Sequence, residues 1–136
     1  MPDFFDYLVG VPLFAVYFLT ALLMTFVYVL IYTKITPHNE ITLIKDNKPA
    51  AAIAMVGSLL GFVIPLASAI ANSQNLLDMV LWGSIALIVQ VLTFFFLRIF
   101  FPKISQRIAN NELASGIWLG AISLAVGILN AACMTY

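Results

Sequence analysis

Long apolar stretches alternate with short polar connections along this chain. Four stretches contain no Asp, Glu, Lys or Arg, and they are Tyr7–Thr33, Pro49–Leu77, Met79–Leu97 and Leu113–Tyr136. Each has about the 20 residues that an α-helix needs to cross the ~30 Å hydrocarbon core of a bilayer. The pattern predicts an all-α integral membrane protein with four transmembrane helices, forming a single membrane domain over residues 1–136.

The composition strengthens this interpretation and narrows the chemistry. Of the 136 residues, 63% are hydrophobic and 9% are charged, which a soluble domain of this size could not expose to water. The chain has one cysteine, Cys133, and one histidine, His38, and it contains no nucleophile set, CxxC pair or phosphate-binding glycine loop. We therefore expect no enzyme activity, no metal site and no cofactor.

The basic residues predict how the helices are oriented. All six lie in two connections, the first-to-second and the third-to-fourth: Lys34, Lys45, Lys48, Arg98, Lys103 and Arg107. In a four-pass chain these two connections share one face. The positive-inside rule places that face in the cytoplasm and both termini in the periplasm. We expect these side chains to face lipid phosphates, and they are too few to form a nucleic-acid surface.

The two halves of the sequence resemble each other at an offset of 64 residues. The segment 44–53 aligns with 108–117, which places Asn47 opposite Asn111. The pattern predicts two helical hairpins as parallel repeats, about residues 7–73 and 78–136. Each basic connection is predicted to hold either a short elbow helix, opening at Thr36–Pro37 in the first copy and at Pro102 in the second, or a plain polar loop.

Small residues indicate which helices touch, because close packing drives helix association in lipid. We expect the second and fourth spans to form the inner pair through Gly57, Gly61, Gly116, Gly120, Ser123 and Gly127. The fourth span has a second small face, of Ala114, Ala121, Ala125 and Ala132. Its members are the repeat equivalents of Ala50, Gly57, Gly61 and Ser68. Two interpretations stay open: the small residues stabilise the monomer alone, or the second face forms a homo-oligomer.

Few polar groups lie inside the spans. Gln90, Asn130 and Ser68, together with Pro65, either line a polar pathway or hold helices together by hydrogen bonds. Pro65 has no N–H for the carbonyl of Gly61, so we expect a bend there, as a hinge or as fixed geometry. In the connections, His38 is expected to be an interfacial or capping residue. The acidic residues there either are solvated loop charges, which is the interpretation we favour, or form paired carboxylates across the repeats, and they are Glu40, Asp46 and Glu112.

Three segments carry a resemblance to a known family: Ala50–Ser73, Asp78–Gly83 with Gln90, and Ser123–Tyr136. In these the chain resembles the YjfL-like proteins of bacterial inner membranes, an uncharacterised family built from two copies of a two-span domain of unknown function. The resemblance implies a multi-pass inner-membrane protein and no assigned activity. Because relatives lie near genes for membrane-stress proteins, it also implies a link to envelope stress.

Two functions follow as hypotheses. The first is a self-associating membrane subunit or scaffold, whose basic connections meet anionic lipid or a peripheral cytoplasmic protein partner. The alternative is an oligomeric channel or small-solute transporter, with Pro65, Gln90 and Asn130 along the path and Asp78 near its outer mouth.

Overall fold

The computed structural model describes residues 4–134, and within that range the chain is helical with no strand. The helices are α1 (Phe4–Leu8), α2 (Gly10–Ile35), α3 (Glu40–Lys45), α4 (Pro49–Asn72), α5 (Leu76–Phe100), α6 (Ile104–Ala109) and α7 (Leu113–Cys133). Four segments are long and apolar enough to cross a membrane: α1 with α2, α4, α5 and α7. The predicted fold class is therefore confirmed. The ends of the predicted domain, residues 1–3 and 135–136, lie outside the described residues.

The uncharged stretch Pro49–Leu77 is divided between two helices. A turn separates α4, which ends at Asn72, from α5, which begins at Leu76. The side chain of Asn75 accepts a hydrogen bond from the backbone N–H of Asp78 at 2.8 Å, which caps the first turn of α5. Leu76 and Leu77 therefore begin the third span. The turn has no charged residue, so the pattern of charges did not reveal it.

Both basic connections contain an elbow helix of six residues, α3 and α6. The predicted opening of α3 at Thr36 is wrong, since Thr36 ends α2 and donates its N–H to Tyr32 O at 3.1 Å. Asn39 caps α3 instead, accepting from Thr42 N at 3.3 Å. The two elbows end alike, with Asn47 and Asn111 each at φ 60°, a left-handed conformation that asparagine tolerates.

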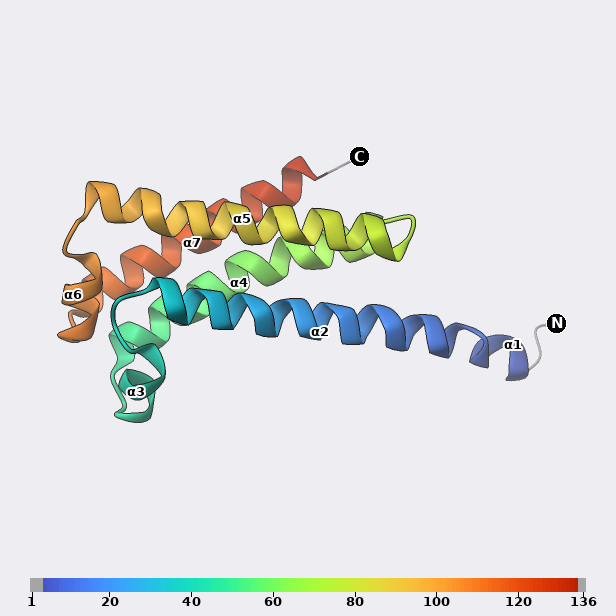
Figure 1. Ribbon diagram of the computed structural model, residues 1–136, viewed down its shortest axis with the longest axis horizontal. Coiled ribbons are helices and arrows are strands. Elements are labelled where there is room, and N and C mark those ends of the chain that lie inside the picture. The colour runs from blue at the N-terminus through green and yellow to red at the C-terminus, as the bar shows by residue number, and fades with distance from the viewer. Residues whose placement is uncertain (1–3, 135–136) are drawn as a thin grey trace.

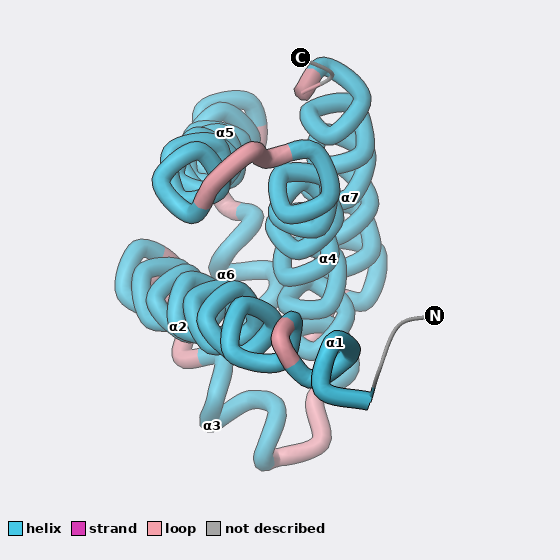
Figure 2. Tube along the Cα trace, turned by 90° about the vertical axis from the view of Figure 1, so that its right-hand side faces the viewer, coloured by secondary structure: helices cyan, strands magenta, loops and turns pink. Residues whose placement is uncertain are grey.

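The helices pack around a central pair. α4 and α7 share the most extensive interface, and α5 lies against both of them (Figure 1, Figure 2). This agrees with the expectation that the second and fourth spans form the inner pair. Within the most apolar 18 residues of each span, the buried share of the residues is 44% in α4, 33% in α5 and 28% in α7. The third span is thus covered at least as well as the fourth.

α2 packs against the other helices from about Tyr17 to its C-terminus. Near its C-terminus Tyr28 stacks on Phe62 of α4, with ring centroids 4.6 Å apart, and Tyr32 meets Phe94 of α5 edge to face at 6.1 Å. Towards its N-terminus α2 diverges from the other helices and ends with α1 beyond them (Figure 1). Only 6% of the most apolar window of this span is buried inside the chain.

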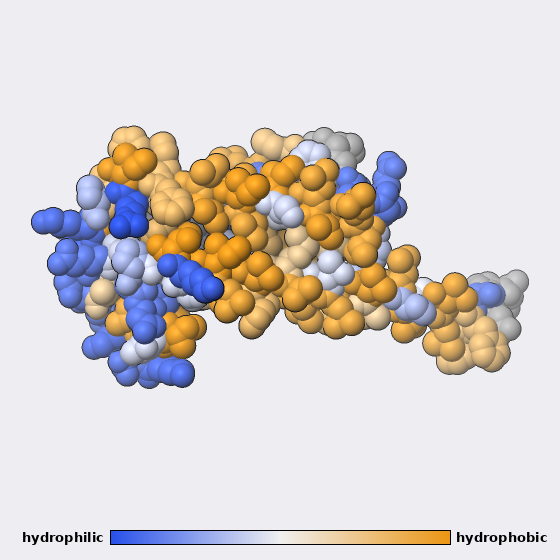
Figure 3. Space-filling model, in the orientation of Figure 1, coloured by the Kyte–Doolittle hydropathy of each residue, from blue (hydrophilic) through white to orange (hydrophobic). Residues whose placement is uncertain are grey.

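The surface follows the same division. On the face shown in Figure 3, the long helices present a largely hydrophobic surface, and hydrophilic residues gather over the two elbows. All six lysines and arginines belong to the elbows or to the last turns of α2 and α5, so they lie at one end of the bundle. We call this the elbow end.

Candidate functional site

Gln90 joins three helices near the middle of the bundle. It extends from α5 between α4 and α7, where only 3% of the residue is exposed. Its Nε2 donates to the carbonyl oxygen of Gly61 on α4 at 3.0 Å and to that of Ser123 on α7 at 3.0 Å. One amide therefore connects all three packed spans at a single level.

The first of these carbonyls needs an outside donor. In an α-helix, the carbonyl of Gly61 would accept from the N–H of residue 65, and Pro65 has none. Gln90 supplies the missing hydrogen bond. Gly61 also makes room for it, because a Cβ there would lie 2.9 Å from both Nε2 and Oε1 of Gln90. Pro65, Gly61 and Gln90 thus depend on one another.

The glycines singled out in the sequence lie where α4 and α7 cross. A Cβ on Gly57 would collide with the backbone of Gly120, and one on Gly116 would collide with the carbonyl of Ala50. Gly127 meets the backbone of Gly61 in the same way. The two backbones touch along the crossing, and any side chain larger than hydrogen would push them apart.

Serines add hydrogen bonds to this interface. Ser58 Oγ donates to Ser123 Oγ at 3.4 Å, and Ser68 Oγ donates to the carbonyl of Ala131 at 3.4 Å. Two amide atoms remain buried without a partner among residues 4–134, Gln90 Oε1 and Asn130 Nδ2. The set contains no ionisable group, so its chemistry is hydrogen bonding between helices.

A second polar feature lies at the elbow end and was missed in the sequence. His38 and Glu40 form a buried pair, with Nε2 2.7 Å from Oε1 and both side chains at most 1% exposed. Burial raises the pKa of Glu40 above its ordinary value of 4.5, while His38, and more weakly Tyr32 and Thr36, oppose the rise. The expectation of a solvated charge is therefore wrong for Glu40, because α3 folds back against α4 and covers it.

The same end offers a small cavity beside this pair. It has a volume of about 230 Å³, and its lining includes His38, Arg98 and Ser105. His38 Nδ1 and Ser105 Oγ have no hydrogen-bond partner in the part of the chain that the structure describes. The imidazole of His38 and the carboxyl group of Glu40 therefore lie within hydrogen-bond distance of each other and away from solvent. A spacing of two residues between His38 and Glu40 was the only signal of this pair in the sequence.

The remaining connection charges behave as expected. Asp46 and Glu112 are exposed, and Glu112 lies 3.7 Å from Arg107 in a solvent-exposed pair. Within residues 4–134, no three His, Cys, Asp or Glu side chains come together in a way that could hold a metal ion.

Comparison with known proteins assigns the family. The family description "Domain of Unknown Function (DUF350)" matches residues 6–134. The UPF0719 inner membrane protein YjfL of Escherichia coli is 47% identical over 123 residues, which are 90% of this chain and 93% of that protein. The UPF0719 transmembrane protein YshE of Bacillus subtilis is 26% identical over 120 residues, 87% of this chain and 90% of that protein. No solved structure matches the chain. Since the matched residues cover nearly its whole length, the protein belongs to the DUF350 family.

Proposed function

We propose that this protein is a non-enzymatic subunit of the bacterial inner membrane that associates with further copies of itself. In this proposal its elbows lie in the cytoplasm and both of its termini in the periplasm. The six basic residues at the elbow end support that orientation by the positive-inside rule. The printed names of the relatives, an inner membrane protein and a transmembrane protein, support the location.

The observation that supports self-association is that α4 and α7 meet through faces that do not correspond to each other in the two halves of the chain. α4 meets α7 through a face that includes Ala50, Gly57 and Gly61. The face of α7 in this contact is a different one, and it consists of Gly116, Gly120, Ser123 and Gly127. If the two hairpins are repeats, the equivalent of the α4 face on α7 is not used in this contact.

That unused face is exposed. Ala114, Ala121 and Ala125 follow Ala50, Gly57 and Gly61 at a distance of 64 residues, and all three are exposed. They recur at helical spacing, so they lie on one side of α7. Because α4 and α7 use non-equivalent faces, their contact leaves this face of α7 uncovered within one chain. A second copy of the protein could cover it through the same kind of contact. Trp118 interrupts the face near the elbow end.

The hydrogen bonds of Gln90 between α4, α5 and α7 support a subunit rather than a channel. A transport path through the chain requires Gln90 to face water, and its amide instead bonds to two helix backbones. The elbows then remain as the surface for partners. They would meet anionic lipid or a peripheral protein of the envelope-stress response, as the family resemblance implies.

Cysteine crosslinking in native membranes tests self-association. The background is Cys133→Ser, because Cys133 is a free, exposed thiol. We expect Ala121→Cys to form a disulfide-linked dimer on oxidation. Leu92→Cys is the matched control, since it is exposed on α5 two residues from Gln90 and therefore at a similar depth. Monomers at both Ala121→Cys and Ala125→Cys, or equal crosslinking at Leu92→Cys, would contradict the proposal.

A further inference from the structure

A cavity of about 450 Å³ opens at the elbow end, where α5, α6 and α7 meet. Its walls are mostly apolar. Phe100 and Phe101 end α5, and Trp118 of α7 meets Phe101 edge to face with ring centroids 6.1 Å apart. Trp is enriched at the boundary between hydrocarbon and headgroups, and Lys103 and Arg107 next to this cavity mark the polar end of the bundle. The cavity therefore lies at the level of the bundle where lipid headgroups are expected.

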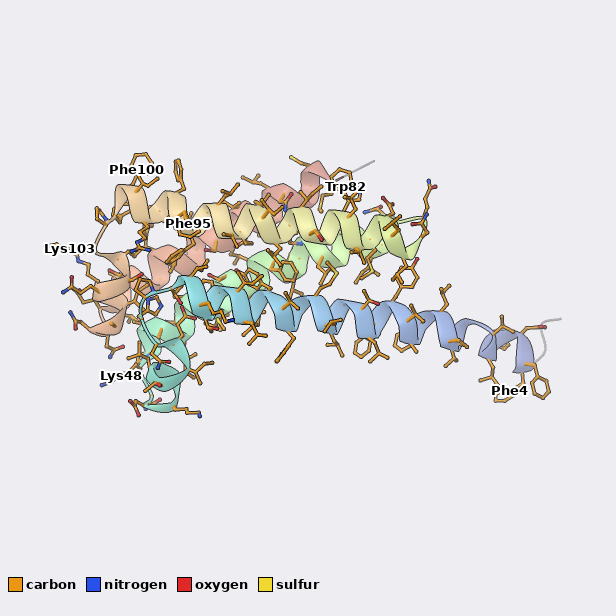
Figure 4. The ribbon with its side chains drawn as sticks, viewed as in Figure 1. Phe4, Lys48, Trp82, Phe95, Phe100 and Lys103 are labelled. Carbon is orange, nitrogen blue, oxygen red and sulfur yellow. The ribbon has the colours of Figure 1, made fainter. Side chains whose placement is uncertain are left out.

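Two basic side chains line the same cavity as this apolar wall. Lys103 and Arg107 both line the cavity, four residues apart in sequence, on or next to the short helix α6. Arg107 pairs weakly with Glu112 at 3.7 Å, where both side chains are at least half exposed. Among the described residues Lys103 makes no ion pair, so two positive charges share one nearby carboxylate and leave a local excess of one positive charge. Figure 4 shows Phe100 and Lys103 at this same end of the molecule.

We propose that this cavity binds one anionic phospholipid. The phosphate lies between Lys103 and Arg107, and the Ser115 hydroxyl can donate to it from the first turn of α7. The glycerol and the first part of an acyl chain lie against Phe100, Phe101 and Trp118. Basic pockets between transmembrane helices bind anionic headgroups in this way. The apolar wall selects a lipid over a free phosphate, because a water-soluble anion gains nothing from it.

The first elbow lacks the same wall. The residue 64 positions before Trp118 is Ala54, which is completely buried in the α4–α7 interface. The first elbow nevertheless carries two lysines of its own, Lys45 and Lys48, and Lys48 lies at the same end of the molecule (Figure 4). It therefore provides a control with the same charge and without the aromatic wall. The lipid site does not rest on self-association.

The test measures lipid binding to the full chain in neutral detergent by native mass spectrometry, with phosphatidylglycerol and phosphatidylcholine as probes. We expect phosphatidylglycerol to bind with a stoichiometry of one and phosphatidylcholine to bind weakly. Lys103→Gln with Arg107→Gln should weaken phosphatidylglycerol binding about 30-fold, the loss expected for two basic residues at a lipid surface. Lys45→Gln with Lys48→Gln should change it less than 2-fold. Equal losses in the two double variants would overturn the proposal, because binding would then follow total charge.

A second arm separates lipid from phosphate. Trp118→Leu keeps both cations and removes the aromatic wall, so we expect it to weaken phosphatidylglycerol binding several-fold. Glycerol 3-phosphate, added in excess, should not displace the lipid from the unsubstituted protein. If it displaces the lipid, or if Trp118→Leu binds the lipid as well as the unsubstituted protein, the site recognises phosphate alone and the lipid assignment is wrong.

Discussion

Gln90 Nε2 donates to the carbonyl oxygen of Gly61. In a regular α-helix this oxygen would accept from the N–H of residue 65, which Pro65 does not have. A proline in the middle of a transmembrane helix leaves a carbonyl in hydrocarbon without a partner, and neighbouring helices commonly supply one. Here the partner is an amide that also reaches Ser123 on α7. The proline and the glutamine therefore form one structural unit with the helix crossing.

The first prediction concerns this unit. Gln90→Leu leaves the carbonyl of Gly61 without a donor and removes a second hydrogen bond to the carbonyl of Ser123, so it should lower the free energy of unfolding by about 1–3 kcal/mol. Unfolding in mixed micelles, followed by circular dichroism against denaturing detergent, measures the change. Ser84→Ala is a suitable control, because Ser84 is exposed on the same helix and bonds only to the carbonyl of Val80.

A double-mutant cycle tests the role of Pro65. Pro65→Ala restores an N–H to the helix, and that N–H can bond to the carbonyl of Gly61. Gln90→Leu should therefore cost about 0.5–1 kcal/mol less in the Pro65→Ala background than in the original chain. If the two substitutions are additive, Gln90 does not compensate for the proline.

The third prediction concerns the contact of α4 with α7. Gly57→Ala would place a Cβ in the backbone of Gly120, and we expect it to destabilise the fold by about 1–3 kcal/mol. Gly10→Ala is the matched control, because a Cβ there meets nothing within 4 Å. It should be neutral or slightly stabilising, since alanine favours helix more than glycine does. Equal melting temperatures for the two variants would show that the backbones of α4 and α7 are not in contact at Gly57.

The sequence predicted the membrane architecture because the physics behind it is local. Uncharged stretches of about 20 residues, charged connections and a run of small residues each report directly on solvent or on helix contact. Even the bond that Pro65 withholds from Gly61 could be derived from the sequence. The donor that replaces it could not, because the meeting of Gln90 with Gly61 depends on the register of three helices.

The buried pair of His38 and Glu40 could not be predicted from the sequence. Loop charges are usually solvated, so Glu40 was expected in water. Its burial is decided by tertiary packing, since α3 folds against α4 and Tyr32 of α2 lies on the same carboxyl group. A turn without charge, such as that at residues 73–75, is hidden for a related reason: its polar residues matter through capping and not through charge.

The fourth prediction follows from the raised pKa of Glu40. The folded state holds this proton more tightly than the unfolded state, so the contribution of Glu40 to stability is complete below about pH 4.5 and is lost as the pH rises through the raised pKa. Glu40→Gln cannot ionise and should not suffer this loss. The melting temperature of the variant relative to the original chain should therefore increase over this pH window and then level off.

Two companion variants make that experiment decisive. His38 lowers the pKa of Glu40, so His38→Gln should move the window to higher pH. Asp46→Asn removes an exposed carboxylate directly after the same elbow helix and controls for the loss of one charge. A difference between Glu40→Gln and the original chain that does not change with pH would mean that Glu40 is not desolvated.

The last prediction concerns the orientation of the bundle. The elbow end carries six Lys and Arg, whereas the opposite end of the described chain has Asp6 and Asp78 and no basic residue. We therefore expect Gln74→Cys, in the turn between α4 and α5, to react in intact cells with a maleimide that cannot cross the inner membrane. Asp46→Cys should react only after that membrane is permeabilised. Both are made in the Cys133→Ser background. The opposite labelling pattern would place the elbows outside the cytoplasm, and the elbow cavity would then face the outer leaflet, whose lipids would have to supply any anionic ligand.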